Sequence, residues 1–348
     1  MARIGINPAR GKISEYRPAK VSLAVLTYIP DLSGYFEHRL EVLQLALASL
    51  RAHTTPPYDL LIFDNGSCQT VVDALHKLQT EGKIDYLVFS RNNIGKIGAL
   101  RLLFEAAPGE IIAYSDEDIL FYPGWLPAHL AILESFPNVG MVSGTPVRDA
   151  ARHACQSLER LRKEIENGRQ TAGTSGLSIS FERRIPEEWE VDWAESTGRD
   201  PQQHLQETSD LKDMVLRVEK PETGERCEAI GSANHFQFVG RKQVLLQVLP
   251  TVWSGKLMGH MIELDQAIDD LGYLRLSTVQ RYTRHLGNAL SHEVLEEAHK
   301  HGLMTGSGGG RKIKDKGRGG KRHWALRLPG SRRFLVAAYK RLFDILYR

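Results

Sequence analysis

The sequence predicts an α/β fold with a mostly parallel sheet flanked by helices. Apolar runs alternate with segments of helical spacing between residues 21 and 143, which is typical of strand–helix–strand units with right-handed crossovers. Polar clusters follow several of these apolar runs, and ligands of such sheets bind at the carboxyl ends of the strands. A chain of 348 residues with 42% hydrophobic residues can also bury the core of one large domain.

The expected elements follow in order along the chain. The helix at 36–52 rests on Leu40, Leu43, Leu47 and Leu50, which recur at helical spacing. Strands are expected at residues 21–28, 60–63, 86–89, 111–114 and 139–142, and further helices at 71–78, 100–105 and 125–135. After residue 150 we expect helices at 151–165, 263–271 and 291–301, another helix after residue 241, and strands at 236–239 and 273–278. Residues 182–206 are acidic and have no clean period.

Three consecutive carboxylates, Asp116, Glu117 and Asp118, follow an apolar run that ends at Tyr114. They would repel one another unless a cation lies among them. Alternation along an extended chain predicts Asp116 and Asp118 on one side and Glu117 on the other. Two carboxylates with open coordination positions suit a Mg²⁺ or Mn²⁺ ion that also binds a substrate's phosphates. A solvated acidic turn is the competing interpretation.

Polar residues at the ends of neighbouring strands favour a site over a simple turn. They are Thr27-Tyr28, Asp64-Asn65 and Arg91-Asn92-Asn93. Because parallel strands end at one edge of the sheet, these residues are expected to lie near the three carboxylates.

Composition and charge bear on the compartment and on the partners. The three cysteines form no CxxC pair, no signal peptide is apparent and no apolar run reaches 18 residues, so a cytoplasmic location is expected. The formal charge of +3 is unevenly spread: residues 311–348 contain thirteen Lys/Arg and two acids, and the remainder is acidic overall. Residues 331–348 predict a basic amphipathic helix, which suits the inner face of an anionic membrane or packing on a protein. Nucleic acid is the least favoured partner, since nothing else resembles a recognition module.

These motifs together resemble the GT-A type of nucleotide-sugar glycosyltransferase, especially glycosyltransferase family 2. The similarity covers roughly residues 21–142 and a second block at about 231–288, and it leaves out 145–230. Its motifs in order are Thr27-Tyr28, Asp64-Asn65-Gly66-Ser67, Arg91-Asn92-Asn93-Ile94-Gly95 and Asp116-Glu117-Asp118. The resemblance implies a GT-A fold, a nucleotide-sugar donor and a Mn²⁺ or Mg²⁺ cofactor.

The resemblance also implies roles for individual residues. Asp64 would accept a hydrogen bond from the base, commonly uracil, while Thr27 and Tyr28 would line the base and ribose pocket. Asp116 would contact the ribose or the metal, and Asp118 would ligate the metal directly. The residues expected to bind the nucleotide-sugar are Thr27, Tyr28, Asp64, Asn65, Arg91, Asn93 and Asp116.

The second block of similarity contains the candidate general base and a further metal ligand. An inverting transfer needs a base that takes the proton from the acceptor hydroxyl. The family usually shows a Glu-Asp pair before a helix, whereas here Leu264 separates Glu263 from Asp265. Either acid can be the base, and we favour Asp265. His285, after the last expected strand, fits the family's histidine ligand of the metal, and neutral imidazole suits Mn²⁺.

The sequence therefore predicts a metal-dependent, inverting glycosyltransferase that moves a sugar, with UDP as the expected nucleotide, onto a glycan or lipid-linked acceptor. Two alternatives stay open: nucleotidyl transfer onto a sugar phosphate, and a non-catalytic scaffold or glycan-binding protein at a membrane. The expected organisation is an N-terminal extension at 1–20, a nucleotide-sugar-binding half at 21–145, an acceptor-side half at 146–305, and a basic linker and amphipathic tail at 306–348.

Overall fold

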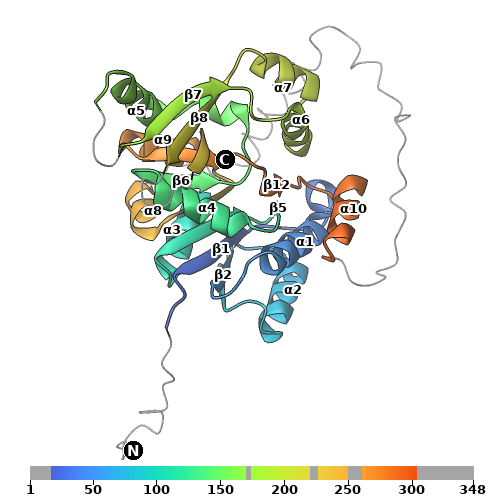
Figure 1. Cartoon of the computed structure of the whole chain (residues 1–348). Coiled ribbons are helices and arrows are strands. Elements are labelled where there is room, and N and C mark those ends of the chain that lie inside the picture. Colours follow the sequence, from blue (N-terminus) through green and yellow to red (C-terminus); the bar gives the residue numbers. More distant parts are fainter. Residues whose placement is uncertain (1–16, 170–173, 220–225, 250–260, 304–348) are drawn as a thin grey trace, which may run out of the picture. The chain divides into compact units, whose positions relative to one another are not determined.

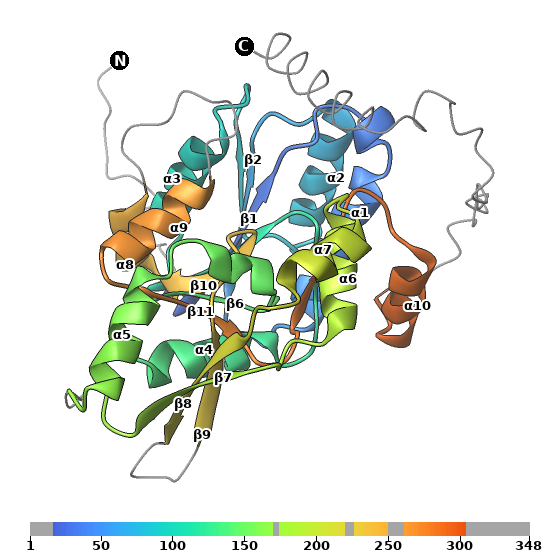
Figure 2. The same cartoon turned by 90° about the horizontal axis from the view of Figure 1, so that it is seen from above.

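A computed structural model describes residues 17–169, 174–219, 226–249 and 261–303 (Figures 1 and 2). The chain divides into two units, residues 1–303 and 304–348. The described residues all belong to the first unit, so the predicted linker and amphipathic tail lie outside them. Among the described residues, no helix is both long enough and apolar enough to cross a membrane.

One ten-stranded sheet organises the first unit, in the order β3-β2-β1-β4-β10-β6-β11-β9-β8-β7. The strands are β1 (Val21–Thr27), β2 (Asp59–Asp64), β3 (Tyr86–Phe89), β4 (Ile111–Asp116), β6 (Val139–Ser143), β7 (Leu177–Glu182), β8 (Asp213–Glu219), β9 (Arg226–Gly231), β10 (Gln237–Arg241) and β11 (Leu274–Thr278). Pairing shows that β10, β9 and β7 run opposite to the rest, so most strands share one direction. The predicted α/β fold with a mostly parallel sheet is confirmed.

Helices cover both faces of this sheet (Figure 2). They are α1 (Arg39–Ala52), α2 (Gln69–Thr80), α3 (Lys96–Ala106), α4 (Trp125–Ser135), α5 (Gln156–Glu166), α6 (Glu187–Ser196), α7 (Pro201–Thr208), α8 (Lys242–Val248), α9 (Met261–Asp270) and α10 (His292–Lys300), with 3-10 turns at Gly34–Phe36 and Arg148–Arg152. Alternate residues of β1 separate the two cores: Leu23 and Val25 face the core formed with α1, α2, α4 and α5, whereas Ala24 and Leu26 face the core formed with α3, α8 and α9.

The poorly periodic region after residue 150 completes the sheet. β7 and β8 pair as antiparallel neighbours, β8 continues to β9, and β9 pairs with β11. α6 and α7 interrupt this antiparallel part as a short helical pair. The sequence did not predict β7, β8, β9, α6 or α7, although Leu177–Glu182 alternates apolar and polar residues as a strand does.

A second, two-stranded sheet joins β5 (Ile119–Phe121) to β12 (Thr283–His285). Its register places His285 opposite Ile119, directly after the carboxylate run. The pair is short, but it brings residue 285 to the carboxyl edge of the main sheet.

Candidate functional site

The carboxyl edge of the parallel strands brings most of the predicted polar residues together. Thr27 and Asp64 are register partners at the ends of β1 and β2, and Asp116 ends β4 opposite Leu26. β10 runs the other way, so its start adjoins this edge, and the Asp116 backbone N–H donates to the Phe236 carbonyl at 2.8 Å. The sheet therefore supplies one continuous polar edge.

Asp64 anchors the loop that follows β2 and keeps one oxygen uncommitted. Its Oδ1 accepts hydrogen bonds from the backbone N–H groups of Gly66 and Ser67, at 3.2 and 3.0 Å. The side chain is 1% exposed, and Oδ2 has no hydrogen-bond partner within the described part of the chain. Thr27 Oγ1, at the end of the adjacent strand, is also buried and also has no hydrogen-bond partner among the described residues. Because buried polar groups are normally satisfied, two such atoms at one strand edge indicate a place for a ligand.

Two loops interlock beside Asp64. Asn65 Nδ2 donates to Asn93 Oδ1 at 2.9 Å, and Asn65 Oδ1 accepts from the Ile94 backbone N–H at 3.0 Å. Gly66 has φ +94°, and a Cβ there would lie 3.0 Å from the Asn92 backbone carbon and the Asn93 nitrogen. Only glycine tolerates both the left-handed backbone and this close approach. Asn65 and Asn93 thus hold the loops together, and their predicted contacts with a nucleotide-sugar stay a prediction.

The two other residues that were predicted to bind the nucleotide are more exposed than Asp64. Tyr28 is half-buried at the end of β1, and Arg91 is exposed in the loop after β3. Both are on the same edge of the sheet as Asp64, as the strand order requires.

The three carboxylates contact cations supplied by the chain itself. Arg39, in the first turn of α1, donates from Nη2 to Glu117 Oε1 at 2.6 Å and from Nη1 to Asp118 Oδ2 at 2.8 Å. Lys96, the first residue of α3, places Nζ 2.6 Å from Asp116 Oδ2, and Asp116 Oδ1 also accepts from the Tyr114 hydroxyl. The prediction that Glu117 points away from Asp118 is wrong. β4 ends at Asp116, and the turn that follows lets one guanidinium bind both side chains.

Burial makes the charges of this cluster strongly interdependent. Burial raises the pKa of Glu117 to about 7, because Arg39 only partly offsets burial and the nearby Asp118 and Asp116 charges. Burial would also raise the pKa of Asp118, but His285 and Arg39 together hold it below its usual range. Asp118 is therefore the firmly ionised carboxylate, and Glu117 is the one that can take up a proton near neutrality.

His285, for which the resemblance implies a metal-ligand role, lies against Asp118. Its Nε2 is 3.3 Å from Asp118 Oδ2, and burial, which would lower its pKa, is outweighed by the Asp118 charge, which raises it. Its ring makes edge contacts with Trp193 and Phe236, at centroid distances of 5.7 and 5.6 Å, and these two rings stack on each other at 5.0 Å. Trp193, on α6, and Phe236 thus form a stacked aromatic pair beside the three carboxylates.

The donor atoms here fit a divalent cation. Asp118 Oδ1 and His285 Nδ1 are both buried, and neither has a hydrogen-bond partner among the residues described. A carboxylate oxygen and an imidazole nitrogen are ligands that Mn²⁺ accepts, and Mg²⁺ commonly takes one or two carboxylates plus substrate phosphates. The described residues contain no group of three or more His, Cys, Asp or Glu arranged to hold a metal by themselves. A metal here would therefore take its other ligands from water or a diphosphate.

Asp265 lies in a second polar cluster and is fully buried on α9. Its Oδ2 accepts from His153 Nε2 and His235 Nδ1, both at 2.8 Å, and lies 3.1 Å from Arg275 Nη2. Burial would raise its pKa, but these bonds and the Arg275 charge lower it to about 2. Glu263, the other predicted base, is half-buried two residues earlier on α9.

Sequence reasoning missed several residues that complete these clusters. They are Arg39, Lys96, His153, Trp193, His235 and Arg275. Two left a readable signal: Arg39 precedes Leu43 by four residues and so shares the buried face of α1, and His235 directly precedes an expected strand. His153 had none: the helix expected at 151–165 begins only at Gln156, and no motif marks the residues before it.

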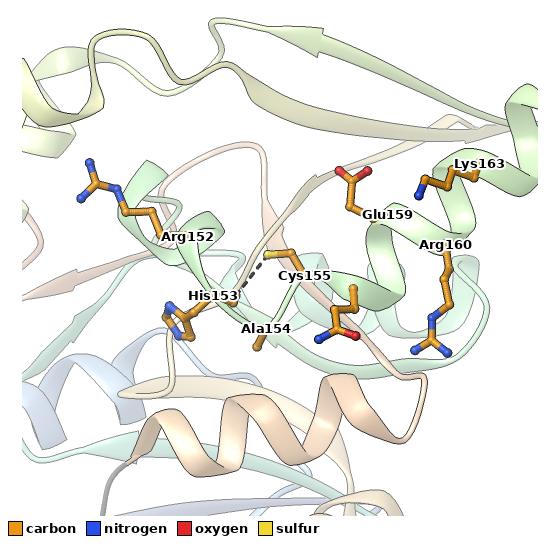
Figure 3. Close-up of a pocket in the computed structure, with 8 residues that line it drawn as sticks. Arg152, His153, Ala154, Cys155, Glu159, Arg160 and Lys163 are labelled. Carbon is orange, nitrogen blue, oxygen red and sulfur yellow. Dashed lines mark hydrogen bonds between the residues drawn. The ribbon is translucent and has the colours of Figure 1, made fainter.

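An open cavity of about 550 Å³ lies along the start of α5, next to the Asp265 cluster (Figure 3). His153 lines it, and the cavity wall continues along the helix. The other lining residues are Arg152, Ala154, Cys155, Gln156, Glu159, Arg160 and Lys163. The His153 carbonyl accepts a hydrogen bond from Cys155 Sγ at 3.1 Å (Figure 3).

Part of the chain is similar to known glycosyltransferases. Residues 35–182 match the model of "Glycosyl transferase family 2". The "Uncharacterized glycosyltransferase alr2836" of Nostoc sp. (strain PCC 7120 / SAG 25.82 / UTEX 2576) is 27% identical over 107 residues, which are 31% of this chain and 33% of that protein. The chain thus aligns with about a third of the length of this curated relative.

Solved structures with partial similarity include two named glycosyltransferases. The mannosyltransferase PcManGT from Pyrobaculum calidifontis, in complex with GDP-Man and Mn²⁺, is 24% identical, with a TM-score of 0.31 over 42% of this chain and 39% of that one. S. aureus TarS 1–349 is 14% identical, with a TM-score of 0.40 over 80% of this chain and 63% of that one.

The match over residues 35–182 confirms the predicted resemblance to glycosyltransferase family 2 for this part of the chain. The match includes the motifs at Asp64, Arg91 and Asp116 but begins after Thr27 and ends before the second block. It also extends to residue 182, so the expectation that residues 145–230 lie wholly outside the resemblance is wrong.

Proposed function

We propose that this chain transfers a sugar from a UDP-sugar to an acceptor hydroxyl with inversion at the anomeric carbon. The observation that carries the proposal is the polar edge formed by Thr27, Asp64, Asp116 and Asp118 at the ends of consecutive parallel strands. This is where sheets of this kind bind nucleotides. The family match over the same segment supports sugar transfer rather than another reaction of the nucleotide.

The nucleotide base is recognised at the ends of β1 and β2. Asp64 Oδ2, buried and unpaired among the described residues, accepts a hydrogen bond from the imide N–H of uracil. Thr27 Oγ1, unpaired in the same sense, bonds an oxygen of the base or ribose. Tyr28 and Arg91 close the rim around the base and the ribose. This arrangement favours uridine, because cytosine has no imide N–H.

The diphosphate lies over the acid cluster. Asp118 and His285, joined by Asp116, would hold Mn²⁺ or Mg²⁺, and such a cation neutralises the charge that develops on the departing diphosphate. Lys96, at the start of α3, lies within reach of the same phosphates and holds Asp116 in place. Arg39 keeps Asp118 ionised, so that its carboxylate is ready to bind a cation.

The acceptor hydroxyl gives up its proton on the side of α9. Its oxygen forms a bond to the anomeric carbon while the bond from that carbon to the diphosphate breaks. The predicted bases Asp265 and Glu263 are on the helix that borders this side. A glycan or a lipid-linked glycan is the proposed acceptor, and residues 311–348, with thirteen Lys/Arg, are the proposed contact with an anionic membrane on its cytoplasmic side.

A thermal-shift panel tests the proposal directly. Purified full-length protein is mixed with nucleoside diphosphates and nucleotide-sugars, each with and without Mn²⁺. A ligand at 100 times its Kd stabilises the fold by about 2.7 kcal/mol, a readable shift. Stabilisation by UDP that increases with Mn²⁺ is expected. Stabilisation by GDP alone would refute the assignment of uridine, and no shift with any nucleotide would refute the function.

Asp118→Ala is the matched variant for turnover. It is expected to lose UDP-sugar turnover while its circular dichroism stays like that of the wild type. Full activity in this variant would remove Asp118 from the mechanism.

A further inference from the structure

We propose that His235 is the general base of the transfer, and that Asp265 is not the base but the residue that positions it. This inference rests on the proposed function and changes the assignment that the sequence favoured. Asp265 was the expected base, yet its carboxylate is fully buried and already bound by two imidazoles and a guanidinium. All three groups bind Oδ2, and Oδ1, which has no hydrogen-bond partner among the described residues, is buried as well, so neither oxygen is open to an acceptor hydroxyl.

Two imidazole rings cover Asp265 and extend towards solvent. The side chains of His153 and His235 are each 31% exposed, whereas Asp265 is 0% exposed. A neutral imidazole that donates to a carboxylate from one nitrogen presents a lone pair on the other. The arrangement is therefore that of a histidine base oriented by an aspartate, the relation known from hydrolytic triads.

His235 is better placed than His153 to take the proton of an acceptor that lies beside the sugar donor. It directly precedes Phe236, whose carbonyl accepts from the Asp116 N–H and whose ring packs on His285. His235 is thus at the polar edge where the diphosphate is proposed to lie. It binds Asp265 through Nδ1, which leaves free Nε2, the nitrogen at the tip of the ring. His153 binds through Nε2 and keeps only Nδ1, which lies next to its own backbone.

Buried hydrogen bonds fix the backbone around the Asp265 cluster. Arg275, 1% exposed, donates to the carbonyls of His153 at 2.9 Å, Ala154 at 3.1 Å and Ala233 at 2.5 Å, in addition to its contact with Asp265. Ala154 has φ +51°, a backbone conformation that non-glycine residues seldom adopt and that surrounding contacts must maintain. Arg275 therefore fixes both segments that carry the histidines. Such local strain clusters at functional sites.

The acceptor O–H proton moves to His235 Nε2 while the acceptor oxygen bonds to the anomeric carbon. The bond between that carbon and the diphosphate breaks, and the electron pair leaves with UDP. Asp265 stabilises the imidazolium that forms and stays ionised throughout.

Replacing each histidine by an amide side chain distinguishes a general base from a histidine with only a structural role. Asn places its N–H₂ near the position of imidazole Nδ1, so His235→Asn keeps a donor to Asp265 and removes Nε2. Gln places its N–H₂ near Nε2, so His153→Gln is the matched control. UDP release from UDP-glucose and UDP-N-acetylglucosamine, with water as the acceptor, gives the rate. UDP affinity and melting temperature are measured on every variant.

We expect His235→Asn to lower kcat by about 10²–10⁴-fold with unchanged UDP affinity, and His153→Gln to stay close to the wild-type rate. Added imidazole should restore part of the rate of His235→Ala but none of that of Asp265→Ala, in which the native ring still occupies its place. A wild-type rate in His235→Asn would overturn the proposal, and so would an equal loss in His153→Gln. Wild-type protein that binds no nucleotide would instead refute the proposed function and this inference with it.

Discussion

The clearest test of the acid cluster is Arg39→Met, which removes the cation shared by Glu117 and Asp118 and keeps an unbranched side chain of similar length. The three side chains are only 8%, 11% and 9% exposed. Removing one partner of a buried ion pair typically costs about 3–5 kcal/mol, because the other charge stays buried without compensation. We expect a loss of unfolding free energy in this range at pH 8.

The size of the loss should depend on pH in a predictable direction. The pKa of Glu117 is already raised to about 7, so the stability that this group contributes is present at low pH and is lost as pH rises towards 7. Without Arg39 its pKa rises further, and protonation then relieves part of the unpaired charge. The difference between wild type and variant should therefore widen above pH 7, by up to about 1.4 kcal/mol per pH unit.

Urea unfolding at pH 6 and pH 8 measures both effects. Lys20→Met is the control, because Lys20 and Glu134 form an exposed pair at 3.4 Å that should be worth less than about 1 kcal/mol. Mn²⁺ provides a second measurement: if Asp118 and His285 hold the metal, Mn²⁺ should stabilise Arg39→Met more than the wild type. A loss as small as that of Lys20→Met, with no change between the two pH values, would refute the reasoning.

Three further predictions concern the strand edge and the second cluster. Asp64→Asn keeps the loop contacts of Oδ1 but replaces the free oxygen by a donor, so the Kd for UDP should rise about 10–100-fold in calorimetry; an unchanged Kd would contradict base recognition by Asp64. Gly66→Ala adds a Cβ at φ +94° against the Asn93 backbone and should cost about 1–2 kcal/mol in urea unfolding, whereas Gly82→Ala, also at positive φ but with open space around it, should cost less. The pKa of Asp265 is lowered to about 2, so its contribution of about 2 kcal/mol is present above about pH 4 and lost as pH falls to about 2; unfolding of Asp265→Asn between these pH values should lack that part of the dependence.

The parallel half of the fold could be predicted closely from the sequence. Strands such as β3 and helices such as α4 have the predicted bounds, because long apolar or periodic runs are the strongest local signals. β7 to β9 and the helical pair α6 and α7 were not predicted. Leu177–Glu182 does alternate apolar and polar residues, but it is one short strand at the sheet edge, and its pairing with β8 depends on residues far along the chain.

The part of the candidate site that lies at the strand ends could be predicted from the sequence. Thr27, Asp64 and Asp116 lie at one edge because parallel strands end together. The partners of the acids were not predicted: Arg39 and His235 each left a signal in the sequence, but that signal does not show which acid far along the chain either side chain contacts. Alternation also failed after Asp116, since it applies only while the chain stays extended.

The position of β10 has a consequence for how the two halves of the chain can be separated. β10 comes from the second half of the sequence, yet it pairs with β4 on one side and β6 on the other, two strands from the first half. A fragment that ends near residue 145 would leave both strands with open edges, and β6 would also lack β11. Unpaired strand edges promote aggregation. The donor-side and acceptor-side halves are therefore interleaved rather than consecutive, and recombination with a relative should exchange loops rather than halves.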